Sequence, residues 1–296
     1  MLRPDSKSMV RKYYSARTGK NPLASQMDSS SFVTLFKYLY HDFLARNYFD
    51  EAFGYTCSCN GQVSGTLGSD IEAKMLLSLR KKNLWPISDK WSAYSLEDAF
   101  DVIEFLYDCV SRPTDGYHNQ YCGREMHYTS FDSDEGRQHF RMEINALLRD
   151  CKDGYELSAE GEILSLAQEG LGSLIEAELP EYNRENVNSR ISKAILKFRS
   201  RHSSWEERRD AVRDLADVLE FLRPKLKTVL LKPDENDLFN IANNFGIRHH
   251  NNEQKTDYDK PIWFTWMFYY YLATIHAAVR LIEKHETSDC VSEAEE

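Results

Sequence analysis

The sequence lacks the signatures that would place it at once in a secreted class. Its six cysteines are spread over 296 residues, a chain too long for the disulfide framework of a small secreted domain. The first residues, MLRPDSKSMVRKYY, contain no apolar run of the kind that a secretory signal peptide needs. These absences lead us to expect a cytoplasmic location.

Motifs of several common enzyme classes are also missing. The glycine-rich GQVSGTLGSD lacks the Gly-Lys-Ser/Thr ending of an NTPase phosphate loop. No nucleophile elbow, His-Glu-x-x-His run or dinucleotide fingerprint occurs. No cofactor is therefore expected.

One apolar run must be weighed against membrane insertion. IWFTWMFYYYLATIHAAV, residues 262–279, has no formal charge and approaches the length of a bilayer span. Because it contains His276 and three consecutive tyrosines and follows a proline, a wholly buried helix of a bundle is favoured. No membrane association is expected.

Basic charge is scarce overall and concentrated in one segment. The net charge of −10 argues against a protein coated with basic surface for bulk nucleic-acid binding. Residues 184–232 nevertheless contain thirteen basic and seven acidic side chains. This segment suits either contact with a phosphate backbone or an ordinary solvated helix face.

Apolar periodicity predicts a mainly α fold. SLEDAFDVIEFLYDCV begins with a capping box, Ser95 with Asp98, and carries one apolar face formed by Phe100, Ile103, Leu106, Tyr107 and Val110. Further helices are predicted at 71–85, 137–150, 184–201, 204–224, 234–246 and from 261 onward. The segment GYELSAEGEIL, starting at Gly154, is predicted as a small β-hairpin and gives the one convincing β signal.

These elements divide the chain into four predicted parts. An N-terminal helical domain with a loop-rich insertion is expected first, then a hairpin with a connecting helix, a four-helix bundle, and an acidic disordered tail. The respective ranges are 1–153, 154–183, 184–285 and 286–296.

The stretch ANNFGIRHHNNEQ, 242–254, gathers side chains suited to chemistry on RNA. If Gly246 ends the preceding helix, two asparagines lie in its last turn, and Arg248, His249 and His250 enter a polar loop. Imidazole can take the proton of a ribose 2′-hydroxyl near neutral pH, and a fixed cation can stabilise the charge on the phosphorane. This pattern favours RNA cleavage without a metal.

Two arginines on the predicted helix 204–224 are candidate RNA contacts. Arg209, Arg213 and Asp217 recur every four residues opposite the apolar stripe of Trp205, Val212, Leu215, Leu219 and Leu222. They can orient the neighbouring loop, or they form an ordinary ladder of charges along one helix face.

The C-terminal part resembles the HEPN superfamily of four-helix bundles, in the branch found in abortive-infection and other antiviral defence proteins. The resemblance rests on RDAVRDLADVLEFLRP, DLFNIANNFGIRHHN and DYDKPIWFTWMFYYYLATIHAAVRLI. The N-terminal part, chiefly YFDEAFGYTC and GSDIEAKMLLSLRKKNLWPI, resembles the N-terminal domain of AbiJ-type defence proteins. Together the two resemblances cover most of the chain.

The HEPN resemblance implies a metal-independent ribonuclease that works as a homodimer. Its motif is an Arg followed by a polar residue, four to six further positions, and a His. In this sequence His249 takes the His position, Asn244 the polar position, and Asn243 stands in place of the Arg. Arg248 is the candidate replacement cation, and His250 completes the predicted catalytic set. Two other pairs, Arg112 with His118 and Arg280 with His285, fit the bare spacing as well, as chance alone allows.

Two functions stay open at this point. The first is a defence-associated endoribonuclease or toxin effector, in which the N-terminal domain senses a trigger or restrains the bundle, alone or with a regulatory partner protein. The second is a non-catalytic HEPN-type module that binds RNA, a nucleotide or a partner protein, since the expected Arg is absent.

Two groups of side chains raise the question of a metal, although none is assigned. Cys57 and Cys59 with His118, Cys122 and His127 contain enough soft ligands for tetrahedral zinc. Because Cys-x-Cys is not a common zinc spacing, buried or surface thiols are the preferred interpretation. His249, His250 and Asp257 are a weaker set, because adjacent histidines point in different directions.

Overall fold

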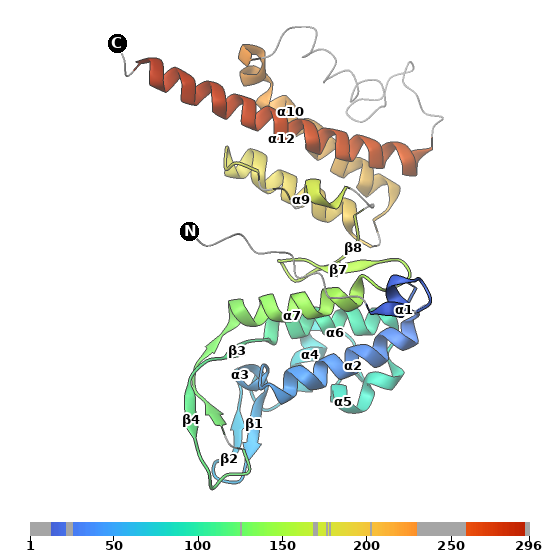
Figure 1. Cartoon of the computed structure of the whole chain (residues 1–296), viewed down its shortest axis with the longest axis vertical. Helices are drawn as coiled ribbons and strands as arrows, with labels where there is room; N and C mark the ends of the chain where they lie inside the picture. Colours follow the sequence, from blue (N-terminus) through green and yellow to red (C-terminus); the bar gives the residue numbers. More distant parts are fainter. Residues whose placement is uncertain are drawn as a thin grey trace. The chain divides into compact units, whose positions relative to one another are not determined.

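The computed structural model describes residues 13–21, 26–124, 126–167, 171–175, 177, 179–201, 203–229 and 259–293. The chain forms two compact units, Met1–Leu166 and Ala167–Glu296, which are described separately (Figure 1). The boundary between them falls inside the predicted connecting segment 154–183, and the hairpin of that segment belongs to the first unit.

The first unit is built on three long helices. These are α2 (Ser29–Ala45), α6 (Leu96–Cys109) and α7 (Ser133–Leu148). Shorter helical turns connect them: α1 (Tyr14–Arg17), α3 (Asp50–Phe53), α4 (Ile71–Leu79), α5 (Ile87–Lys90) and η2 (Trp91–Ala93). The long helices contact one another and enclose a core that is rich in phenylalanine, including Phe32, Phe36, Phe43, Phe49 and Phe140.

Helix α6 confirms its predicted capping and apolar face. The Ser95 side chain accepts a hydrogen bond from the Asp98 N–H, and the Asp98 carboxylate accepts one from the Ser95 N–H. The apolar residues predicted to share one face are all buried. The prediction for 71–85 was too long, because α4 ends at Leu79, where Arg80 adopts a left-handed conformation with φ 56°.

Four two-stranded antiparallel sheets complete the described part of the first unit. They are β1 (Gly54–Cys57) with β2 (Gly61–Ser64), β3 (Arg112–Pro113) with β6 (Phe131–Asp132), β4 (Gly116–His118) with β5 (Met126–Tyr128), and β7 (Tyr155–Leu157) with β8 (Ile163–Ser165). The hairpin β7–β8 was predicted. The other three were missed, because strands of two to four residues carry no readable apolar alternation.

The second unit is a helical bundle in its described part. Its elements are α8 (Gly172–Ile175), a π-helical turn η3 (Arg184–Asn188), α9 (Ser189–Arg199), α10 (Trp205–Val229) and α12 (Lys260–Glu293). Helix α10 packs against both α9 and α12, and the rings of Phe198 and Phe268 stack with centroids 4.0 Å apart. The predicted helix 234–246 lies outside the described residues.

Helix α10 differs from its prediction in length and in one apolar contact. It continues through Pro224 to Val229, because Leu222 and Leu226 on either side of the proline are buried and hold the backbone helical. Trp205, predicted on the buried stripe, is 43 % exposed, and the Arg208 guanidinium lies over its ring.

Helix α12 is neither wholly buried nor suited to a membrane. Phe264, Phe268 and Tyr271 lie in the core, whereas Trp263 and Trp266 are partly exposed, so the prediction of a wholly buried helix was wrong. Within the described ranges, no helix combines the length and apolarity that a bilayer crossing requires. The helix extends to Glu293 and thus includes most of the predicted tail 286–296.

Candidate functional site

Helix α9 concentrates the basic charge of the second unit. It contains Arg190, Lys193, Lys197 and Arg199 and no acidic residue. Arg190 and Lys193 are exposed, Lys197 pairs with Asp214 on α10, and Arg199 is buried. The predicted basic exposed face is therefore present, and among the residues that the structure describes it consists of Arg190 and Lys193.

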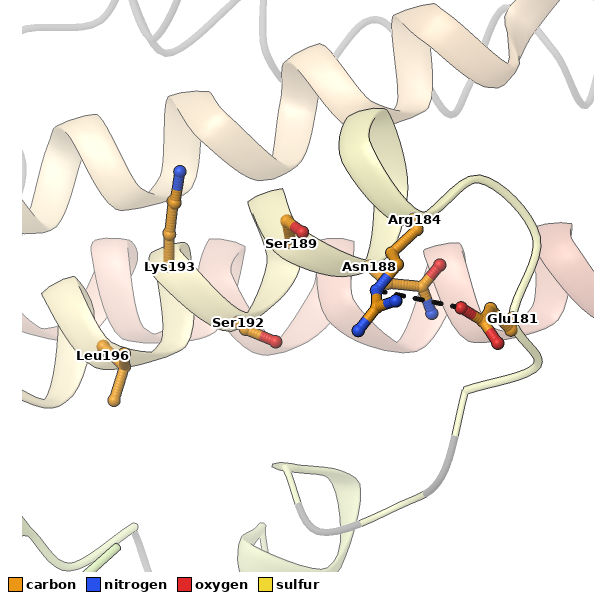
Figure 2. Close-up of a pocket in the computed structure, with 7 residues that line it drawn as sticks. All are labelled: Glu181, Arg184, Asn188, Ser189, Ser192, Lys193 and Leu196. Atoms are coloured by element: carbon orange, nitrogen blue, oxygen red, sulfur yellow. Dashed lines mark ion pairs between the residues drawn. The ribbon is translucent and has the colours of Figure 1, made fainter. Parts of the chain in front are cut away.

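A shallow pocket of about 430 Å³ lies along α9 and the turn before it. Figure 2 shows its lining as a row along the helix from Leu196 to Arg184, with the hydroxyls of Ser189 and Ser192 between. Arg184 forms a long ion pair of 4.0 Å with Glu181, and both side chains are mostly exposed. The pocket thus has two cations and two hydroxyls along its length, with Arg184 paired to Glu181 and the Lys193 amine pointing away from Arg184 in Figure 2.

The start of α9 is irregular, and this irregularity shapes the pocket. The Asn183 side chain accepts a hydrogen bond from the Asn186 N–H and caps the turn η3, which has the π-helical pattern often found at functional sites. Asn188 donates to the Pro180 carbonyl, while its buried amide oxygen has no partner among the described residues.

The predicted site residues fall partly within the described structure. Arg209 and Arg213 lie on α10, where Arg213 is exposed and Arg209 is half-buried near Asp210. The predicted catalytic residues lie outside the described residues: Asn243, Asn244, Arg248, His249 and His250. Asp257, weighed as a metal ligand, lies there too.

In the first unit, the structure gathers four of the five side chains weighed as zinc ligands. The ligand atoms of Cys57, Cys59, Cys122 and His127 all lie within 4.8 Å of one another. The Cys59 Sγ lies 3.4 Å from the Cys57 Sγ and 3.5 Å from the His127 Nε2. Cys57, Cys122 and His127 are buried, whereas Cys59 is exposed.

The sheet register explains why His127 joins this cluster and His118 does not. His127 on β5 is the direct partner of Tyr117 on β4, and their rings stack 5.0 Å apart. Successive residues of a strand point to opposite faces, so His118, next to Tyr117, points away and is exposed. The sequence could not distinguish His127 from His118 as a member of the cluster, because the pairing of the short strands β4 and β5 is not visible in it.

The pKa values of Cys122 and Cys59 are shifted in opposite directions. The Ser58 hydroxyl, 3.5 Å from the Cys122 Sγ, and next the Arg124 N–H lower the pKa of Cys122 to about 5. Loss of hydration raises the pKa of Cys59 to about 11. Cys122 is therefore the more acidic of these two thiols.

Comparisons of the chain with protein-family models, with curated proteins and with solved structures find no match.

Proposed function

We propose that the second unit is a HEPN-like module that binds RNA and cleaves it without a metal, as the effector of a defence-associated protein. The observation that carries the proposal is the basic helix α9 beside a pocket lined by Arg184, Lys193 and serine hydroxyls. A chain with a net charge of −10 can hold a phosphate backbone only where such cations gather locally.

The charge pattern on α9 supports phosphate contact more than structural pairing. Within the described part of the chain, Arg190 and Lys193 have no acidic partner, whereas Lys197 on the same helix is neutralised by Asp214. Each cation that meets a phosphate releases a counterion, so binding through α9 has a steep dependence on salt. Arg209 and Arg213 on α10 extend the proposed contact.

Cleavage is assigned to the stretch 243–250, which lies outside the described residues. In the proposal His249, with His250 beside it, exchanges protons with the ribose 2′-hydroxyl and the leaving oxygen. Asn243 and Asn244 orient the phosphate, and Arg248 supplies the cation that the HEPN motif places five positions earlier, at residue 243. The active form is a homodimer, and the first unit senses the trigger or restrains the effector, alone or with a partner protein.

The alternative is a HEPN-type module that binds without cleaving. Asn243 in place of the motif's Arg favours it, because an amide carries no charge to stabilise the phosphorane. Both functions use the same basic helix, so an assay must separate binding from cleavage.

The test compares purified full-length wild type with two variants on labelled single-stranded RNA. The double variant Arg190→Glu and Lys193→Glu is expected to bind RNA at least tenfold more weakly and with a shallower salt dependence. The variant His249→Ala is expected to bind as the wild type does and to cleave at least a hundredfold more slowly.

The control for charge is Lys74→Glu, an exposed lysine on α4 of the first unit, which should leave RNA binding unchanged. Wild type that binds but never cleaves selects the non-catalytic alternative. Equal RNA binding by wild type and the α9 double variant overturns the proposal.

A further inference from the structure

The tips of hairpins β1–β2 and β4–β5 form a site that the proposed RNA chemistry does not use. Cys57 ends β1, Cys59 lies in the turn to β2, Cys122 lies in the loop after β4, and His127 is central in β5. More than sixty residues of chain separate the two pairs of side chains. Their convergence is therefore a product of the tertiary fold and not of local sequence.

The four ligand atoms lie within 4.8 Å of one another, and two of the distances between them are close to those of a tetrahedral metal site. With metal–sulfur bonds of about 2.3 Å and metal–nitrogen bonds of about 2.0 Å, ligand atoms at the corners of a tetrahedron lie about 3.5–3.8 Å apart. The Cys57–Cys59 sulfur distance is 3.4 Å and the Cys59–His127 distance is 3.5 Å. A disulfide, at about 2.05 Å, is much shorter.

The surrounding groups orient the ligands as partners of a metal site do. The Tyr55 hydroxyl lies 3.4 Å from the His127 Nδ1, which leaves Nε2 facing the sulfurs. The Asn60 N–H donates to the Cys57 Sγ at 3.3 Å, an interaction that stabilises a thiolate. The stacked Tyr117 ring covers one face of the imidazole.

The hairpins need such a cross-link because they have almost no apolar core. Most side chains of β1, β2 and β4 are exposed or half-buried, and the cluster of large buried residues in the first unit includes none of the four ligands. Figure 1 shows β1, β2 and β4 extending beyond α3, at the end of the unit away from β7–β8. Short isolated hairpins are marginal in water without a further constraint.

We propose that Cys57, Cys59, Cys122 and His127 bind one structural Zn²⁺ that clamps the two hairpins together. Three thiolates and one imidazole form a ligand set typical of structural zinc. An iron–sulfur cluster usually needs four thiolates, and magnesium and calcium prefer oxygen ligands. Since the protein supplies all four ligands, no position remains for a reacting water, and the site stabilises the fold instead of catalysing a reaction.

The test begins with full-length protein purified under reducing conditions and analysed for bound metals by mass spectrometry. One zinc per chain is expected. After chelation, one equivalent of Co²⁺ should give the visible absorption of a tetrahedral site and the near-ultraviolet bands of thiolate ligation, and Zn²⁺ should abolish both. Metal removal should also increase amide hydrogen exchange in 54–64 and 116–128 while leaving α9 and α10 unchanged.

The chain offers matched controls for the ligand variants. Cys122→Ser and His127→Ala should each weaken metal binding at least a hundredfold, whereas Cys151→Ser and His118→Ala, a buried thiol and an imidazole outside the cluster, should retain it. If a ligand variant fails to fold, the Co²⁺ spectrum of the wild type still tests whether thiolates bind a metal in tetrahedral geometry. Protein without stoichiometric metal and without a thiolate–Co²⁺ spectrum overturns the proposal, as does stoichiometric iron or copper in place of zinc.

Discussion

The hydroxyl of Tyr55 has a defined position beside the imidazole of His127. Tyr55 and Cys57 are two residues apart on β1, so their side chains point to the same face, toward β5. The Arg124 guanidinium lies 4.2 Å from the centre of the Tyr55 ring and holds that ring in place. When Nε2 binds a metal, the Nδ1–H donates to the Tyr55 oxygen and fixes the tautomer.

Removing this hydroxyl should therefore weaken the metal site without destroying it. Tyr55→Phe is expected to reduce zinc affinity about tenfold, the lower end of the effect of losing such a partner. Competition with a coloured chelator measures the change. Tyr121→Phe, at an exposed tyrosine between β4 and β5, should leave the affinity unchanged, and an equal loss in both variants would contradict the assigned role of Tyr55.

At the residue scale, the sequence identified the candidate metal ligands but could not predict which of them lie close together in the fold. Cys57, Cys59, Cys122 and His127 were all recognisable as soft ligands. Choosing between His118 and His127 required the pairing of β4 with β5, and that pairing depends on long-range contacts. A short strand with exposed side chains does not specify its register by apolar pattern.

Among the elements, α7 shows how one glycine permits close packing. A Cβ at Gly136 would lie 2.6 Å from the Ser111 Cα and 2.7 Å from the Arg112 N, atoms of the backbone that cannot rotate away. The helix therefore approaches the chain that follows α6 closely enough to hold strand β3 in place.

Gly136→Ala should destabilise the first unit by roughly 1–3 kcal/mol, the range for forcing extra volume into a packed contact. Chemical denaturation followed by circular dichroism measures the loss. Gly123→Ala, where a Cβ meets no atom within 4 Å, should change stability by far less. A Gly136 variant as stable as the wild type would show that α7 can move away from Ser111 at little cost.

The ends of a helix were predictable where capping residues and apolar periodicity agree. They were less predictable where the expected end depended on a single proline. Ser95 and Asp98 fixed the start of α6, as expected. Pro224 was expected to end α10, but the buried Leu222 and Leu226 carry the helix past it. Tertiary packing can outweigh the loss of one backbone hydrogen bond.

At the scale of the whole molecule, the first unit should respond to metal removal and the second unit to acid. Buried on α12, His276 has a pKa lowered from 6.5, first by loss of hydration and then by the positive charge of Arg280. The folded second unit therefore binds this proton more weakly than the unfolded chain does. Its stability should be fully present above pH 6.5 and should fall as the pH drops below that value.

Thermal unfolding of the second unit at pH 7.5 and 5.5 tests this sign. The wild type should melt at a lower temperature at pH 5.5, and His276→Gln should show a smaller difference between the two pH values. Hydrogen exchange resolved by segment separates this transition from that of the first unit. A pH dependence unchanged in the variant would assign the acid sensitivity to other groups.

The positions of the four metal ligands also determine whether the two fragments of a proteolytically cut chain stay together. Helices α4, α5 and α6 all lie between Cys59 and Cys122, so the zinc ion closes this stretch into a ring. A single protease cut in the segment 66–70 would leave two fragments joined through the metal as well as through the phenylalanine core. Such a nicked protein should migrate as one species in a native gel, and its hairpins should separate only when a chelator is added together with denaturant.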